Sequence, residues 1–148
     1  MNKQLFRIIN PIVRTLLRSP LHGLMSRNTV LVEFKGRKSG RAFVLPVSYF
    51  QQRNQIICCT AKENIWWRNL LQVDDIHLVL RGKRREGRLH LVREDHDQTL
   101  TLLRDFLLHV PRDAAHAGVR MDREGKPMET DLTSRADEFV FLVIDLNA

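Results

Sequence analysis

Alternating apolar and polar residues constrain the fold of this chain more than any other feature. Between residues 29 and 34 every second side chain is apolar, and the alternation returns between residues 42 and 50. Further short apolar runs cover 55–60, 76–81, 86–92 and 139–145. A period of two is typical of strands with one buried face. The sequence therefore predicts six strands.

Short connections join most of these strands, and no regular succession of strand and long helix points to a parallel sheet. One helix is expected over 64–73, with Trp66, Leu70 and Val73 on one stripe, and another over 97–110. We therefore expect a mainly β fold. It should be a closed or nearly closed barrel of about six antiparallel strands, with two outer helices and a further helix at the amino terminus.

Glycine and polar clusters indicate where the chain turns. The tetrapeptide Gly82-Lys83-Arg84-Arg85 is expected to join the strands 76–81 and 86–92. The polar segment 112–135 contains two glycines and a proline, and it is interpreted as a long loop or lid.

A chain of 148 residues suits one domain. We expect a helical segment over 1–25 and the barrel over 27–148. Residues 3–19 place apolar side chains at helical spacing with basic residues between them, which predicts an amphipathic helix that packs on the barrel or rests on a membrane surface. Arginines interrupt every apolar run before it reaches membrane-span length. A cytoplasmic protein is expected, with membrane association left open.

Cysteine and histidine usage excludes several kinds of chemistry. Cys58 and Cys59 are adjacent and would point to opposite faces of a strand, so we expect two core residues, no disulfide and a reducing compartment. The six histidines form no close ligand pair, and we expect no metal site. Neither a GxGxxG loop nor a GxSxG elbow is present. If the chain is an enzyme, a bound cofactor performs the reaction.

The net charge of +7 favours anionic partners such as phosphorylated cofactors, nucleic acid or an acidic membrane. The basic stretch 81–88 is the candidate for nucleic acid. Aromatic residues make up 7% of the chain and fall mostly at core positions, so few of them are expected to be available for stacking on nucleic-acid bases. The loop Gly36-Arg37-Lys38-Ser39-Gly40-Arg41 is a better anion site, because it combines three cations and a hydroxyl with two glycines.

Three motifs in order carry a family resemblance. They are the basic loop within residues 26–48, the following Leu45-Pro46-Val47, and the later Trp66-Trp67-Arg68-Asn69-Leu70. Together they resemble the deazaflavin-dependent nitroreductases and related flavin or deazaflavin oxidoreductases. The resemblance implies a split β-barrel of the FMN-binding type, often dimeric, that holds a phosphorylated flavin-type cofactor and reduces a small acceptor such as a quinone or a nitroaromatic.

The resemblance also implies which residues bind the cofactor, and it implies no catalytic side chain. These are Arg37, Lys38, Ser39, Gly40 and Arg41 in the turn, Pro46 and Val47 on the next strand, Thr60, Ala61 and Lys62 after the third strand, and Trp67 and Asn69 on the helix. The chain departs from the family pattern at two places. The loop over 60–65 is shorter than usual, and Phe43 or Val44 stands where relatives place a cation. Coenzyme F420 and FMN therefore both stay open as the cofactor. The alternatives are a non-catalytic carrier of a cofactor or lipid and a basic nucleic-acid-binding module.

Overall fold

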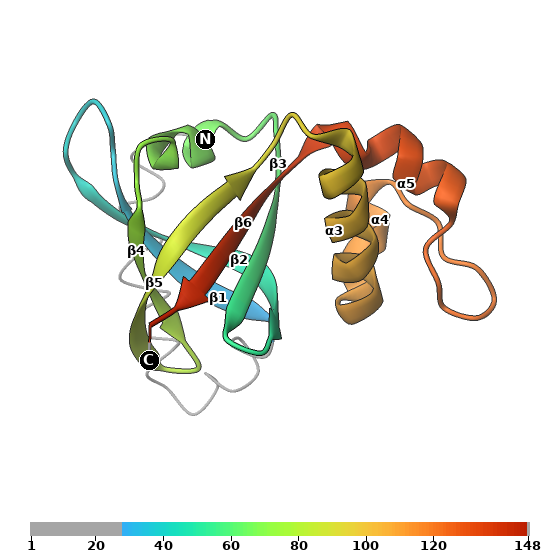
Figure 1. The fold of residues 1–148 in the computed structure, drawn as a ribbon, viewed down its shortest axis with the longest axis horizontal. Helices are drawn as coiled ribbons and strands as arrows, with labels where there is room; N and C mark the ends of the chain where they lie inside the picture. Colours follow the sequence, from blue (N-terminus) through green and yellow to red (C-terminus); the bar gives the residue numbers. More distant parts are fainter. Residues whose placement is uncertain (1–27, 148) are drawn as a thin grey trace.

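The computed structural model describes residues 28–147, which form a closed barrel of six antiparallel strands with the α-helices gathered on one side (Figure 1). The strands are β1 (Thr29–Lys35), β2 (Ala42–Gln52), β3 (Gln55–Ala61), β4 (Asp75–Leu80), β5 (Lys83–Val92) and β6 (Phe139–Leu146). Around the barrel they follow the order β1-β2-β3-β6-β5-β4. The predicted mainly β barrel of six strands is confirmed.

The helices follow β3 and β5 in the chain. They are the 3-10 helices η1 (Ile65–Leu70), η2 (Pro111–Asp113) and η3 (Ala136–Glu138), and the α-helices α3 (His96–His109), α4 (Ala114–Ala117) and α5 (Glu129–Arg135). Asp95 caps α3 by accepting a hydrogen bond from the backbone N–H of Gln98 at 3.1 Å. The helix predicted over 97–110 is confirmed.

The predicted amino-terminal helix over 3–19 lies outside the described residues. Its packing and its contact with a membrane therefore stay predictions. Within residues 28–147 no helix combines the length and the hydropathy that crossing a bilayer requires.

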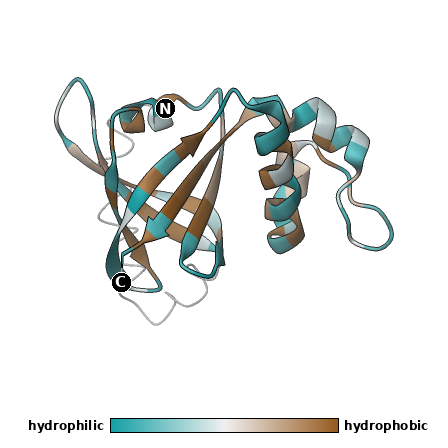
Figure 2. Cartoon of the chain, in the orientation of Figure 1, coloured by the Kyte–Doolittle hydropathy of each residue, from teal (hydrophilic) through white to brown (hydrophobic). Residues whose placement is uncertain are grey.

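Strand alternation divides the apolar side chains between two clusters. The barrel interior contains alternate apolar residues of the strands, such as Val30 and Val32 on β1 and Ile56 and Cys58 on β3. Cys59 points outward instead and packs against the second cluster. Both cysteines are free, and the prediction of two core residues on opposite faces is confirmed. Figure 2 shows hydrophobic residues along the barrel strands and hydrophilic residues at the turns.

The second cluster attaches the helices to the outside of the barrel. Phe106 of α3 packs edge-on against Phe50 of β2 and Phe141 of β6, with ring centroids 5.9 and 6.3 Å apart. Leu103, about one helical turn before it, and Leu107, the next residue along, are fully buried beside it. This packing holds α3 against the strands at the place where β2 and β3 separate.

The turn between β4 and β5 differs from the predicted Gly82–Arg85 loop. The two turn residues are Arg81 and Gly82, with φ angles of 48° and 80°, and β5 already begins at Lys83. Two positive φ angles in succession define the type I′ turn, whose twist matches that of the flanking strands. The cations of 83–85 therefore lie on a strand, not in a loop.

Two further predictions are corrected. Only 65–70 of the helix expected over 64–73 is helical, and it is a 3-10 helix, the form that short helical pieces commonly take. The segment 112–135 is not a loop or lid, because it contains η2, α4 and α5. A bidentate ion pair between Arg120 and Asp131 and a β-bridge between Met121 and Pro127 hold it together.

Candidate functional site

The basic turn between β1 and β2 is closed by its own backbone. Gly36 donates its N–H to the carbonyl of Arg41 at 2.9 Å, and Gly40 donates to the carbonyl of Gly36 at 2.8 Å. Gly40 needs its φ of +67°, which side chains with a Cβ rarely adopt. Ser39 accepts a hydrogen bond from the backbone N–H of Arg41 through its Oγ at 3.3 Å. The hydroxyl of Ser39 therefore braces the turn.

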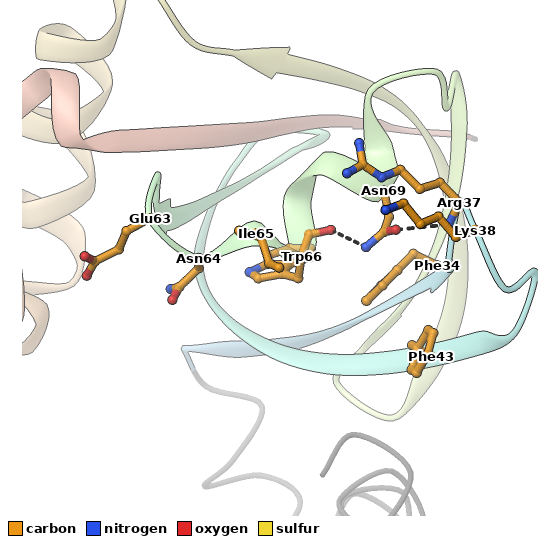
Figure 3. A pocket seen from close by; sticks show the side chains of 10 residues that line it. Phe34, Arg37, Lys38, Phe43, Glu63, Asn64, Ile65, Trp66 and Asn69 are labelled. Atoms are coloured by element: carbon orange, nitrogen blue, oxygen red, sulfur yellow. Dashed lines mark hydrogen bonds between the residues drawn. The ribbon is translucent and has the colours of Figure 1, made fainter. Parts of the chain in front are cut away.

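Asn69 of η1 connects this turn to the body of the barrel. Its Oδ1 accepts a hydrogen bond from the backbone N–H of Arg37 at 3.0 Å, and its Nδ2 donates to the carbonyl of Trp66 at 2.8 Å (Figure 3). Both ends of one side-chain amide are used. The position of the basic turn is thereby set by the helix that follows β3.

A cavity of about 300 Å³ lies between the turn and η1, and we call it the turn cavity. Phe34 stacks on Phe43 at 5.5 Å and packs on Trp66 at 5.6 Å between ring centroids, which makes one wall aromatic. Its lining residues are Phe34, Gly36, Arg37, Lys38, Phe43, Glu63, Asn64, Ile65, Trp66 and Asn69. Two cations and three aromatic rings thus line the same cavity (Figure 3).

A second cavity, of about 350 Å³, opens where β2 and β3 part. The two strands pair only from Tyr49 and Cys58 to the β-turn, so no strand among residues 28–147 pairs with the first half of β2 on that side. We call this space the edge cavity. It is lined by the β2 residues 45–48, the β3 residues 59–61, Asn64 and Trp66, the α3 residues Leu103, Phe106 and Leu107, and Asp113, His116, Ala117 and Phe139.

Backbone polar groups of β2 face the edge cavity. Tyr49 donates its N–H toward β1, to the carbonyl of Asn28 at 3.0 Å. Since successive residues of an antiparallel strand direct their backbone groups to opposite sides, Pro46 and Ser48 direct theirs to the unpaired side. Pro46 lacks an N–H and so leaves no open donor there. Its position on an unpaired strand edge is the one predicted for a proline within a strand.

The two cavities adjoin, because Asn64 and Trp66 line both. Trp66 is held in place by its Nε1, which donates to the Oγ1 of Thr60 at 3.1 Å. The neighbouring Trp67 donates to the carbonyl of Lys62 at 3.1 Å and lines neither cavity. The indole shared by both spaces is therefore that of Trp66.

The residues that the resemblance implied fall into three groups. Arg37, Lys38 and Asn69 line the turn cavity, Pro46, Val47, Thr60 and Ala61 line the edge cavity, and Ser39, Gly40, Arg41, Lys62 and Trp67 line neither. Sequence reasoning missed Trp66, although the adjacent tryptophans were a signal. It also missed Asp113 and His116. Because 112–135 was interpreted as a loop, no sequence pattern indicated that these two residues line a cavity.

The thiols near the edge cavity are not nucleophiles. Burial raises the pKa of Cys58 to about 12. Burial, and after it the nearby carboxylate of Asp113, also raises the pKa of Cys59. Both side chains are therefore neutral thiols near pH 7 and act as small apolar groups. Residues 28–147 contain no group of three or more potential metal ligands.

One curated relative matches part of the chain. A candidate F420H(2)-dependent quinone reductase of Mycobacterium tuberculosis is 35% identical over 72 residues, which are 45% of this chain and 60% of that protein. The chain thus matches less than two thirds of the length of this relative. No protein-family model matches the chain.

Solved structures share the fold. An FMN-binding protein of Nostoc punctiforme related to pyridoxamine 5′-phosphate oxidase is 16% identical, with a TM-score of 0.57 over 93% of this chain and 79% of its own. An F420-H2 dependent reductase is 15% identical, with a TM-score of 0.53 over 79% of this chain and 94% of its own. The resemblance to deazaflavin-dependent reductases and to FMN-binding split barrels is confirmed.

Proposed function

We propose that the chain is an oxidoreductase that binds a phosphorylated flavin-type cofactor across the two cavities and passes hydride to a small acceptor. One observation carries the proposal: the cationic turn cavity and the largely apolar edge cavity meet at Trp66 and Asn64. A flavin or deazaflavin has the same division, with an anionic tail attached to a flat ring. The relative described as a candidate F420H(2)-dependent quinone reductase supports this activity.

The turn cavity suits the tail. The guanidinium of Arg37 can bind two phosphate oxygens at once, and the ammonium of Lys38 adds a point charge. Both side chains are exposed and have no partner among the described residues, so they are available to a ligand. Asn69 holds the backbone of Arg37 at 3.0 Å, which reduces the ordering that binding requires.

The edge cavity suits the ring. One wall is the open edge of β2, and the other is the apolar face of α3 with Leu103 and Phe106. The carbonyl of Pro46 and the N–H of Ser48 provide an acceptor and a donor for the polar rim of such a ring. When bound in its reduced form, the ring supplies the hydride. The protein contributes orientation and a largely apolar surface for the ring.

Two cofactors remain in the proposal. The names of the curated relative and of a structural neighbour support coenzyme F420, and the FMN-binding neighbour supports FMN. The name of the relative also supports a quinone as acceptor. A further structural neighbour, with a TM-score of 0.56, is described as a domain-swapped dimer, which supports a homodimer here.

Fluorescence titration of the purified protein with FMN and with F420, in parallel, tests the proposal. We expect saturable binding of one of them at micromolar concentration or better. Lys38→Glu should weaken it at least tenfold, because the charge reversal places an anion beside the tail. Lys83→Glu, the same change on β5 and outside both cavities, is the control. If the wild type binds neither cofactor, the proposal is wrong; if it binds one but reduces no acceptor, the chain is a carrier.

A further inference from the structure

His116 differs from the other described histidines. His77, His90 and His96 each lie within 3.5 Å of a carboxylate, and the Nδ1 of His109 lies 2.8 Å from a backbone carbonyl. Within residues 28–147 His116 has no hydrogen-bond or ion-pair partner. It is also the one of these five whose side chain lines a described cavity.

The location of His116 gives it access to both the cavity and solvent. It lies on α4, on the helical wall of the edge cavity, and it is exposed. The open edge of β2 lines the same cavity with Pro46 and Ser48. The other titratable side chains of the lining are Cys59, whose thiol stays protonated, and Asp113, whose carboxylate lies 3.8 Å from Arg112. His116 is therefore the one imidazole of this lining, and its two ring nitrogens allow one side chain both to donate and to accept a proton.

Reduction of a quinone consumes a proton together with the hydride. The hydride forms a new bond on the quinone and leaves an oxyanion, which must be protonated before a hydroquinone can leave. The lining of the edge cavity contains no lysine or arginine among the described residues, so an oxyanion formed there would have no permanent opposite charge beside it. A proton donor on the wall of the cavity would remove this charge.

We propose that His116 is a catalytic residue that protonates the acceptor as it is reduced. This rests on the proposed function. The imidazolium of His116 gives its proton to the oxyanion of the acceptor, while the hydride and its electron pair come from the reduced cofactor, which is oxidised. The cofactor releases its own proton to solvent. His116 then takes a proton from solvent through its exposed side, so protons and electrons balance.

Menadione reduction by the cofactor-loaded protein tests the proposal with His116→Ala. We expect kcat to fall about 100-fold, the range typical of a lost general acid. Free imidazole at millimolar concentration should raise the kcat of His116→Ala at least tenfold. No such rescue is expected if the role of His116 is merely structural. Cofactor affinity should change less than threefold. The control, His90→Ala on β5, lies outside both cavities and should leave kcat unchanged.

A binding measurement separates this inference from the proposed function. In protein loaded with oxidised cofactor, the ring-proton NMR signal that disappears in His116→Ala should shift when menadione is added. Any one of four results would overturn the role of His116: an unchanged kcat in His116→Ala, a loss of kcat without rescue by imidazole, an unshifted NMR signal, or a collapse of cofactor affinity. A wild type that still binds cofactor would remain a proposed reductase in each case. A wild type that binds neither cofactor would overturn both.

Discussion

The Oδ1 of Asn69 accepts a hydrogen bond from the backbone N–H of Arg37 at 3.0 Å, across 32 residues of sequence. The same side chain donates to the carbonyl of Trp66 at 2.8 Å. One amide thus joins the turn that carries the cations to the helix that carries the shared indole. This relationship makes the two cavities parts of one site, because the turn cannot move independently of η1.

Asn69→Ala should therefore weaken cofactor binding while leaving both cations of the turn, Arg37 and Lys38, in the chain. We expect affinity to fall about three- to tenfold and the free energy of unfolding to fall by about 1 kcal/mol, the usual effect of losing one or two hydrogen bonds. Cofactor titration and urea unfolding measure the two effects. Gln98→Ala, an exposed position on α3, is the control. Unchanged affinity in Asn69→Ala would show that the turn holds its position without this bond.

Thr60 should stabilise the fold through its hydroxyl. It is 7% exposed and accepts the Nε1–H of the buried Trp66 at 3.1 Å. Thr60→Val keeps the side-chain volume but leaves that donor without a partner, which costs about 1–3 kcal/mol. Thr60→Ser keeps the acceptor and should lose much less. Urea unfolding followed by tryptophan fluorescence compares the two, and equal losses would argue against the bond.

Local patterns were sufficient to predict much of the barrel. Alternation between residues 29 and 50 predicted β1 and β2 with the turn between them, because a strand pattern depends only on neighbouring residues. The cations Arg37 and Lys38 were found from the composition of the loop between these strands, which is also a local feature. A closed or nearly closed barrel was expected from short connections. The order of the strands around it and their register were not predicted, since pairing depends on contacts between distant segments.

The helical wall of the site could not be predicted in this way. The segment 112–135 looks polar and contains turn residues, and its helices are too short to show a clear period. Its conformation depends on Arg120, whose guanidinium and backbone N–H both bind Asp131 11 residues later. Because that pairing is invisible in a local pattern, His116 was placed on a loop and its position at the edge cavity was missed.

Gly87 on β5 should not tolerate a side chain. A Cβ at this position would lie 2.6 Å from the Cγ2 of Ile144 and 2.7 Å from the carbonyl oxygen of Asp145 on β6. Since the second contact is with backbone, β5 and β6 would have to move apart, and we expect Gly87→Ala to cost about 1–3 kcal/mol. Thermal unfolding measures this, with the exposed neighbour substitution Arg88→Ala as control. A melting temperature equal to that of the control would contradict the close approach of these strands.

Acid should loosen α5 before the barrel. Hydrogen bonds from the guanidinium and the backbone N–H of Arg120 lower the pKa of Asp131 to about 2, and a hydrogen bond from Arg104 lowers that of Glu129. Because these pKa values are lower in the folded than in the unfolded chain, ionisation stabilises the fold. For Asp131 this contribution is complete above its usual pKa of about 3.9 and is lost as the pH falls toward 2.

Hydrogen exchange of the α5 backbone between pH 5 and pH 2 is the measurement that checks this prediction, after correction for the intrinsic pH dependence of exchange. Protection of α5 should fall over the lower part of that range while the strands β3 and β6 stay protected. In Asp131→Asn the amide cannot ionise, so α5 should be less protected at pH 5 and should change less with acid. If the wild type and this variant lost protection in parallel, the ion pair with Arg120 would not be what holds α5 in place.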